Sequence, residues 1–158
     1  YLFGLPFWSA GPNRLEAAGK VGTPQIVAPG MVGLLGGVGS PENFPPQFRT
    51  RPIYFHNPNN PCVLLNPEEM AMVGEAIAHK LNQATGPTAI VIPLHGFMEF
   101  DRPGKPFHDP ESIKAFSEAL KRHIEPKIRV VELDAHINDP VFAQEVVALF
   151  DSMMKKLG

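Results

Sequence analysis

The sequence predicts an α/β fold in which an open parallel sheet carries helices on both faces. Four segments repeat apolar residues at three- and four-residue steps, which is typical of helices. Apolar runs of strand length lie between these segments. The runs are apolar without alternation, as expected for strands that are covered on both faces. Strand and helix therefore alternate along the chain.

Each expected helix has a recognisable beginning. Three of them start with a side-chain acceptor followed by proline, and proline loses nothing at the first helical position because its missing N–H would be unpaired there. Glu69, three residues after Asn66, predicts a capping box. The expected helices are Pro12 to about Lys20, Pro67 to about Asn82, Pro110 to about His123 and Pro140 to about Lys156, and the three caps are Asn66, Asp109 and Asp139.

The expected strands are Gln25–Ala28, Ile53–Phe55, Ala89–Ile92 and Ile128–Leu133, with "YLFGLPF" at the start of the chain as a poorer candidate. One segment, Pro29 to Pro52, shows no clear element. It is longer than compact domains usually leave without structure, so it is interpreted as a Gly/Pro-rich loop or arm.

Composition limits the class of protein. A length of 158 residues suits a single domain. A formal charge of -2, without a basic run, gives no electrostatic reason to expect nucleic acid. No apolar run reaches the roughly 18 residues of a membrane span. The single cysteine, Cys62, fits a reducing compartment, and a cytoplasmic location is expected. Because the chain opens at Tyr1 inside an apolar segment, we interpret it as one lobe of a larger polypeptide.

The loops that follow the strands are the expected place for a ligand. All strand-to-helix loops of a parallel sheet gather at its carboxyl edge, where open α/β sheets bind their ligands. The loops in question are Ser9–Gly11, His56–Asn66, Pro93–Asp109 and Asp134–Asp139, and they carry His56, His95, His108 and His136. Helix N-termini on the same edge favour anions.

Several residues in these loops have two interpretations. His95 and His136 could act as general bases, or His136 could bind the loop backbone. Gly96 would let a ligand approach the main chain. Asn57 could contact a ligand or close a turn. For four residues a structural role is favoured over ligand binding. Asp101 and Arg102 are interpreted as surface charges, Asp139 as a helix cap and Cys62 as a packed residue. The spacing of histidines and carboxylates predicts no metal site.

Four motifs resemble a known family: "SAGPNRLEAAGKVGTPQIVAPGMV", "FRTRPIYFHNPN", "PGKPFHDPE" and "HINDPVFA". Together they look like the carboxyl-terminal half of the Tm-one-like ATP-binding domain family. The resemblance implies a two-lobed protein in which each lobe is Rossmann-like, and it implies ATP, with or without magnesium, as the cofactor. The positions matched by motif and expected to bind it are Ser9, Gly11, His56, Asn57, Gly96 and Asn138. The expected partners are the amino-terminal lobe and further copies of the chain.

The sequence also departs from the family pattern. Leu64 and His95 stand where members often carry a fixed cation, and losing such cations weakens a phosphate site. Three functions are therefore kept open. The first is a nucleotide or anion crevice at the sheet edge. The second is a hydrolase or lyase that acts on a small oxygenated metabolite through loop histidines. The third is an oligomerisation or interaction module built on the arm.

Overall fold

A computed structural model describes residues 1–5 and 9–156. The α/β class predicted from the sequence is confirmed, since helices flank a parallel sheet. The helices are α1 (Ala17–Lys20), α2 (Pro67–Asn82), α3 (Pro110–His123) and α4 (Pro140–Lys155). No helix among these residues is both long and apolar enough to cross a membrane.

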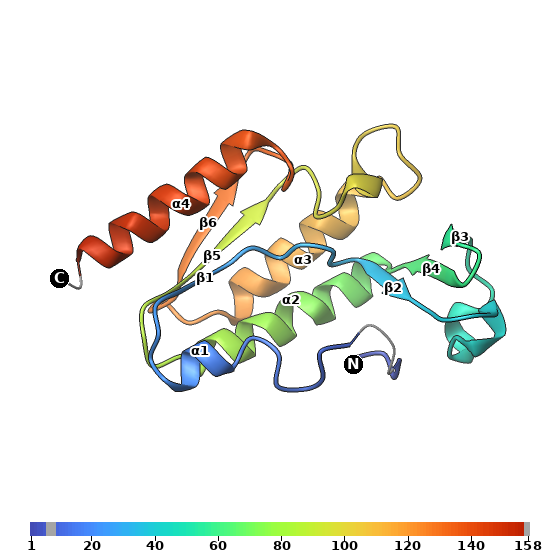
Figure 1. The fold of residues 1–158 in the computed structure, drawn as a ribbon, viewed down its shortest axis with the longest axis horizontal. Helices are drawn as coiled ribbons and strands as arrows, with labels where there is room; N and C mark the ends of the chain where they lie inside the picture. Colours follow the sequence, from blue (N-terminus) through green and yellow to red (C-terminus); the bar gives the residue numbers. More distant parts are fainter. Residues whose placement is uncertain (6–8, 157–158) are drawn as a thin grey trace.

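The parallel sheet has three strands, β1 (Gln25–Val27), β5 (Thr88–Pro93) and β6 (Arg129–Leu133), in the order β1-β5-β6. A full Rossmann-like sheet has more strands than these three, so the Rossmann-like arrangement is not confirmed. In Figure 1 the central strand β5 runs between the paired helices α2 and α3 and the single helix α4.

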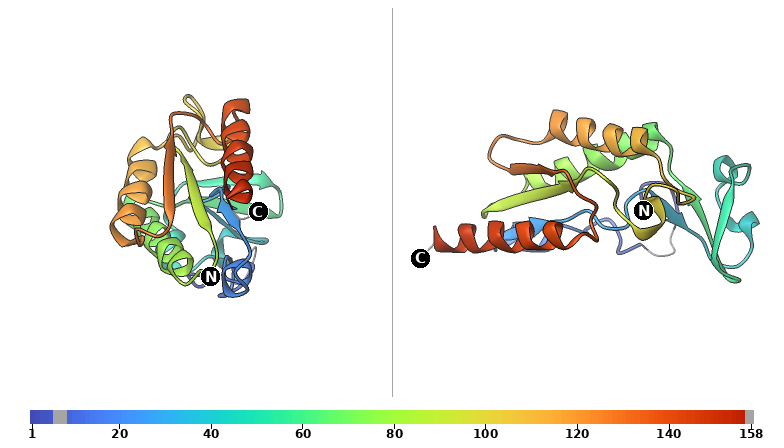
Figure 2. Two further views of the ribbon diagram at one scale, coloured as in Figure 1. Left: turned by 90° about the vertical axis from the view of Figure 1, so that its left-hand side faces the viewer. Right: turned by 90° about the horizontal axis from the view of Figure 1, so that it is seen from above.

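Alternate residues of β5 fill two separate cores, one on each face of the sheet. Ile90 and Ile92 belong to the large core formed with α2 and α3. Ala89 and Val91 belong to a smaller core formed with α4. All six residues of β5 are buried, because successive side chains of a strand point to opposite faces and both faces are covered. Figure 2 shows the helices on either side of the sheet.

A second sheet, which the sequence analysis did not predict, is antiparallel. Its strands are β2 (Leu34–Gly36), β3 (Ile53–Asn57) and β4 (Asn60–Leu64), in the order β2-β4-β3. The prediction of a strand-to-helix loop over residues 56–66 was wrong, because most of that stretch forms a hairpin. Strand β4 was not predicted because Pro61 and the surrounding asparagines are typical of turns, although Cys62 and Val63 of this strand are fully buried.

The Pro29–Pro52 segment is part of the domain core. Besides β2 it contains two short 3-10 helices, η1 (Pro41–Asn43) and η2 (Pro46–Phe48). Phe44 and Phe48 are 1% and 0% exposed and join the large core. The segment therefore packs against the core through Phe44 and Phe48, and through Leu35 of β2.

The amino-terminal region differs from expectation. The first helix begins at Ala17 and not at Pro12, because Leu15 has a backbone φ of 71°, which no right-handed helix accepts. Tyr1–Leu5 forms no strand, and residues 6 and 7 of the "YLFGLPF" candidate, with Trp8 after it, lie outside the described residues.

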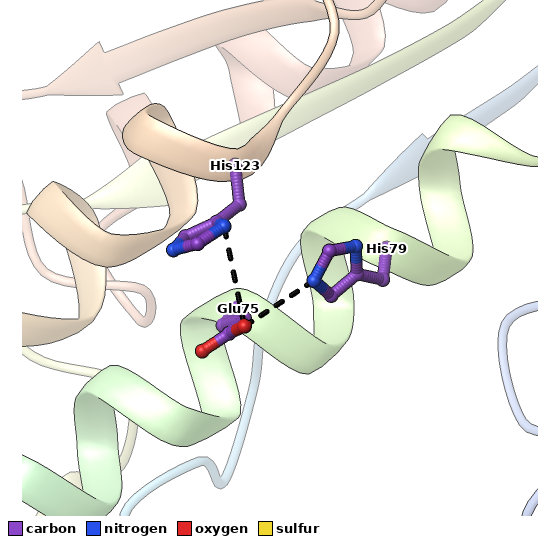
Figure 3. Close-up of side chains that lie close together, drawn as sticks. All are labelled: Glu75, His79 and His123. Carbon is purple, nitrogen blue, oxygen red and sulfur yellow. Dashed lines mark hydrogen bonds and ion pairs between the residues drawn. The ribbon is translucent and has the colours of Figure 1, made fainter.

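The long helices begin where the caps predict. Asn66 and Glu69 form both halves of the capping box of α2, and Asp109 accepts the backbone N–H of Ser112 at the start of α3. Helices α2 and α3 pack side by side along one face of the sheet. The two helical histidines, His79 and His123, meet across this seam (Figure 3).

Candidate functional site

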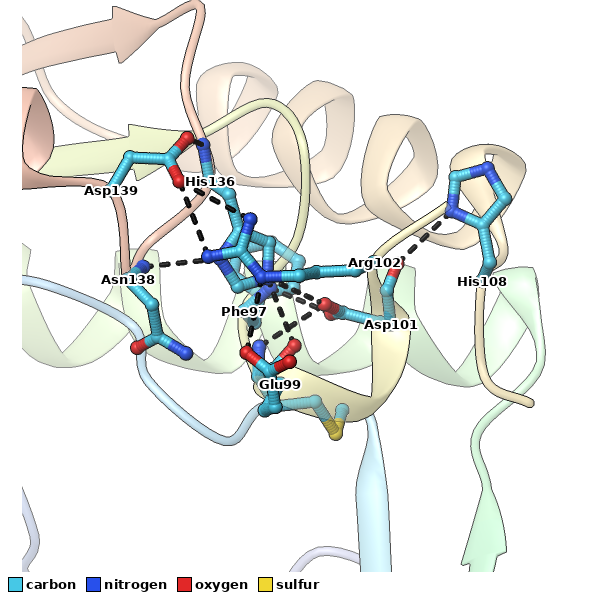
Figure 4. A network of polar contacts seen from close by, with 9 residues as sticks. Phe97, Glu99, Asp101, Arg102, His108, His136, Asn138 and Asp139 are labelled. Carbon is cyan, nitrogen blue, oxygen red and sulfur yellow. Dashed lines mark hydrogen bonds and ion pairs between the residues drawn. The ribbon is translucent and has the colours of Figure 1, made fainter. Parts of the chain in front are cut away.

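The loops that follow β5 and β6 share a buried polar pair, Asp101 and His136 (Figure 4). Asp101 lies in the short 3-10 helix η3 (Glu99–Asp101) and is 4% exposed, and His136 is 2% exposed. The Asp101 carboxylate accepts the backbone N–H groups of Phe97 and Met98 at 2.6 and 3.2 Å. The favoured interpretation of Asp101 as a surface charge was therefore wrong: its carboxylate folds back onto the loop that carries it.

Both ring nitrogens of His136 are occupied within the protein. Nδ1 accepts the backbone N–H of Asn138 at 3.1 Å, so the ring proton is assigned to Nε2. Nε2 then donates to the Met98 carbonyl at 2.9 Å and lies 3.1 Å from Asp101 Oδ1. In this arrangement His136 ties two loops together, and neither nitrogen is directed toward solvent.

Gly96 is packed against this pair. Its φ is +128°, and a Cβ at this position would stand 2.2 Å from Asp101 Oδ1 and 2.8 Å from His136 Cδ2. The space beside the Gly96 main chain is therefore occupied by protein side chains. The glycine is required because any side chain would displace the buried carboxylate.

Asp139 stands at the cap position of α4, but its side chain does not cap the helix. Its Oδ2 accepts the His136 backbone N–H at 2.8 Å, and its Oδ1 faces both terminal nitrogens of Arg102 at 3.2 Å. The capping prediction for this side chain was wrong because a tertiary partner competes for it. The bond from His136 N–H, assisted by Arg102, holds the pKa of Asp139 below its usual value. Arg102, interpreted as a surface charge, also reaches Glu99 at 3.0 Å.

The loops that follow β5 and β6 together form the rim of the sheet's carboxyl edge, and His95 lies on its solvent side. Its Nε2 is 2.8 Å from Asp134 Oδ1, and the two side chains are 54% and 88% exposed. Asn138 is also exposed, and its backbone N–H serves His136. His95, Gly96, His136 and Asn138 therefore come from neighbouring loops, although only His95 and Asn138 are open to solvent.

His56 and Asn57 lie on the β3–β4 hairpin. The His56 ring is exposed and stands 6.2 Å from the Phe100 ring, centroid to centroid. The Asn57 side chain accepts the backbone N–H of Asn59 at 3.0 Å, which closes the hairpin turn. Cys62 beneath them is buried, and burial raises the pKa of its thiol, in agreement with a packed residue.

Ser9 and Gly11 line a different feature, a cavity of about 300 Å³ between the amino-terminal segment, β2 and α2. The Ser9 hydroxyl accepts the backbone N–H of Gly11 at 3.0 Å. The walls are mostly apolar, and two cations, Arg14 and Lys80, stand among the lining residues. The apolar walls include Leu2, Phe3, Leu15, Val32, Leu35, Val73, Ala76 and Ile77.

The two cations differ in their surroundings. Lys80 donates to Glu16 at 2.6 Å and to the Pro12 carbonyl, so its charge is already matched. The hydrogen bonds from Lys20 and Lys80 lower the pKa of Glu16 to about 2. Arg14 is exposed and forms no ion pair or hydrogen bond with the residues that the structure describes. Arg14 is therefore the lining cation whose charge no described carboxylate matches.

The cavity and the rim are joined through Met31. This residue lines the cavity, and its backbone N–H donates to the Phe97 carbonyl at 2.9 Å, next to Gly96.

The sequence-predicted residues fall into three places: the cavity, the rim and the hairpin. Sequence reasoning missed Met31, Lys80 and the buried state of Asp101, for which no local pattern gives a signal.

Comparison with known proteins identifies relatives over nearly the whole chain. A model of the C-terminal domain of an uncharacterised protein family, UPF0261, matches residues 2–154. A UPF0261 protein of Brucella melitensis is 40% identical over 90% of the chain, and one of Clostridium tetani is 38% identical over 94%. The ToMV susceptible protein tm-1(GCR26) of Solanum lycopersicum is 29% identical over 92% of the chain.

These proteins are longer than the chain. The matched regions make up 34% and 37% of the two bacterial relatives and 20% of the tomato protein, so the chain spans about a third of the bacterial relatives' length. The match agrees with the carboxyl-terminal placement and with the Tm-one-like resemblance inferred from the motifs. The chain therefore belongs to the UPF0261 family, as a C-terminal domain of that family.

Proposed function

We propose that this domain binds a nucleotide or a related organic anion in the cavity lined by Ser9, Gly11 and Arg14. The observation that carries the proposal is the cavity itself, about 300 Å³ with mostly apolar walls and an exposed arginine beside it. Small-molecule sites begin at roughly this volume and combine apolar walls with a few polar groups. The Tm-one-like resemblance points to ATP as the first ligand to test.

The lining suits a ligand with an apolar part and a charged part. Val73 and Ile77 of α2 are buried and offer an apolar surface to a ring system. Arg14 offers a guanidinium, which binds phosphate or carboxylate oxygens in pairs. In this arrangement the base or other organic part enters the cavity and the anionic group stays near its exposed side.

Backbone strain in the lining also favours a binding role. Leu15 and Met31 are the two non-glycine residues with positive φ among the described residues, at 71° and 58°. Both line the cavity. Such conformations are uncommon for large side chains and gather at ligand sites, where the surrounding structure maintains them.

Calorimetry tests the proposal directly. The chain is titrated with ATP, ADP and AMP, each with and without magnesium. Arg14→Ala should weaken nucleotide binding about 10- to 150-fold, since a hydrogen bond to a charged group contributes about 1.5–3 kcal/mol. Arg129→Ala, at an exposed position on β6, is the matched control and should bind as the parent chain does.

A second variant tests the cavity rather than the charge. Ala76 lines it from α2, so Ala76→Leu should fill part of the space and reduce binding. Ala71→Leu lies on the same helix outside the lining and is the control. Absence of heat with every nucleotide at millimolar concentration, or equal binding by all four variants, would remove the proposal.

The exposed His95–Asp134 pair favours a second candidate, the hydrolase or lyase. An imidazole held 2.8 Å from a carboxylate is oriented as a general base requires. Turnover of small esters and hydroxy acids by the chain should then disappear in His95→Ala and persist in His108→Ala. Absence of turnover across such substrates, or turnover that survives His95→Ala, would exclude this activity for the pair.

A further inference from the structure

We propose that Glu75, His79 and His123 form a binding site for a zinc-class transition metal ion at the seam between α2 and α3. Their candidate ligand atoms all lie within 4.8 Å of one another. Figure 3 shows the Glu75 carboxylate joined to each of the two imidazole rings by a dashed line. This cluster is separate from the cavity and from the sheet-edge loops.

The distances approach those of a tetrahedral metal site. Glu75 Oε1 is 3.3 Å from His79 Nε2 and 4.0 Å from His123 Nδ1. Metal–ligand bonds of about 2.0–2.1 Å in a tetrahedron place neighbouring ligand atoms roughly 3.3–3.4 Å apart. The Glu75–His79 distance already matches this spacing, and binding of one ion would draw His123, whose Nδ1 is 4.0 Å from Glu75 Oε1, closer to the other two ligands.

Rigid helices determine this geometry. Glu75 and His79 are four residues apart on α2, so they lie on the same helical face. His123 occupies the last turn of α3. Gly74 lets the two helices approach, because a Cβ there would stand 2.4 Å from the Phe116 carbonyl. The site thus depends on close contact between the two backbones.

Asn82 fixes the end of α3 beside α2. Its Nδ2 donates to the His123 carbonyl at 2.9 Å, and its Oδ1 accepts the backbone N–H of Glu125 at 2.8 Å. The main chain that carries His123 is therefore held from both sides. Ligands on packed helices, supported by such contacts, keep their geometry before the metal arrives.

The plainer interpretation is a surface ion pair between Glu75 and His79, a common arrangement at this spacing. The contribution of His123 from a second helix distinguishes the cluster from such a pair. The side chains of Glu75, His79 and His123 are 46%, 59% and 32% exposed, so a metal ion has a path to them and water can complete its coordination. Two imidazoles with one carboxylate favour Zn²⁺, Co²⁺, Ni²⁺ or Cu²⁺ over Mg²⁺ and Ca²⁺, which prefer oxygen ligands.

The test uses Zn²⁺ and Co²⁺ with the chain free of any histidine tag. Calorimetry should show one saturable Zn²⁺ per chain, and bound Co²⁺ should give the visible absorption of a tetrahedral complex. His79→Gln and His123→Gln keep polarity and approximate size, and each should weaken Zn²⁺ binding more than about tenfold. His56→Ala removes an exposed histidine from another element and should bind Zn²⁺ as the parent does.

A stability measurement provides an independent readout. Because the metal would join α2 to α3, Zn²⁺ should raise the melting temperature of the parent chain and of His56→Ala, and should leave that of His123→Gln unchanged. Magnesium should have no such effect. The proposal is overturned if no stoichiometric Zn²⁺ binding occurs, or if both glutamine variants bind Zn²⁺ as tightly as the parent.

Discussion

The carboxylate of Asp101 occupies the space in which a side chain on Gly96 would have to stand, since a Cβ there would be 2.2 Å from Oδ1. The two residues lie five positions apart in the loop after β5. Position 96, directly after His95, has a φ of +128° and no room for a side chain, and both features require glycine.

Gly96→Ala should therefore destabilise the fold by about 2–5 kcal/mol, combining backbone strain with overpacking. Gly104→Ala is the matched control, because its φ is +81° but a Cβ there would meet nothing within 4 Å. It should cost only the strain, about 1–2 kcal/mol. Urea unfolding measures both, and equal losses would show that the Asp101 contact is unimportant.

The two rim histidines should respond differently to truncation. His136→Ala removes a buried ring and leaves polar partners unpaired, so it should cost about 2–4 kcal/mol. His95→Ala alters an exposed ring and should stay within about 0.5 kcal/mol. Thermal unfolding of both variants checks this difference. A stable His136→Ala protein would return that residue to the candidates for direct ligand contact.

Asp139 should contribute to acid sensitivity. Its pKa is lowered chiefly by the His136 N–H and also by Arg102, so the folded protein binds its proton less readily than the unfolded chain. Its stabilising effect is present above the unfolded pKa of about 3.9 and is lost as the pH falls through the lower folded value.

Asp139→Asn should therefore be less stable than the parent at neutral pH, and the difference should shrink as the solution is acidified below about pH 4. Circular dichroism at a fixed denaturant concentration across the acid range measures this. Asp151→Asn, on the exposed face of α4, is the control. Parallel acid profiles for the parent and Asp139→Asn would contradict the assigned role.

Gly74→Ala tests the contact between α2 and α3. In an isolated helix the change stabilises by about 0.5–1 kcal/mol, but here the new Cβ would stand 2.4 Å from the Phe116 carbonyl. The steric conflict should prevail, with a net loss of about 1–3 kcal/mol in urea unfolding. A gain in stability would show that the helices separate easily, and it would also weaken the case for the metal site.

Part of the fold could be read from the sequence. The starts of α2, α3 and α4 were predicted correctly because Asn or Asp followed by proline is a local signal, although the Asp139 side chain does not cap α4. The strand β4 was missed because Pro61 and the neighbouring asparagines locally resemble a turn, and because its pairing with β2 joins residues that are far apart in sequence. The first helix was drawn too long because nothing in the sequence reveals the left-handed backbone of Leu15.

The candidate site was less predictable. The topology argument correctly placed His95, Gly96, His136 and Asn138 in loops that follow parallel strands. It could not show that His136 turns inward to Asp101, since burial of a polar side chain depends on partners distant in sequence. The His79–His123 contact likewise arises only when α2 and α3 pack together.

The position of the Asp139 side chain has a consequence for local unfolding. Because this carboxylate binds His136 and Arg102, it offers no acceptor to the first turn of α4. The start of the helix is held instead by its contact with Arg102, in the loop after β5. Release of that loop should therefore free the beginning of α4 in the same cooperative opening. Amide hydrogen exchange would then report similar protection for both segments, although they are far apart in sequence.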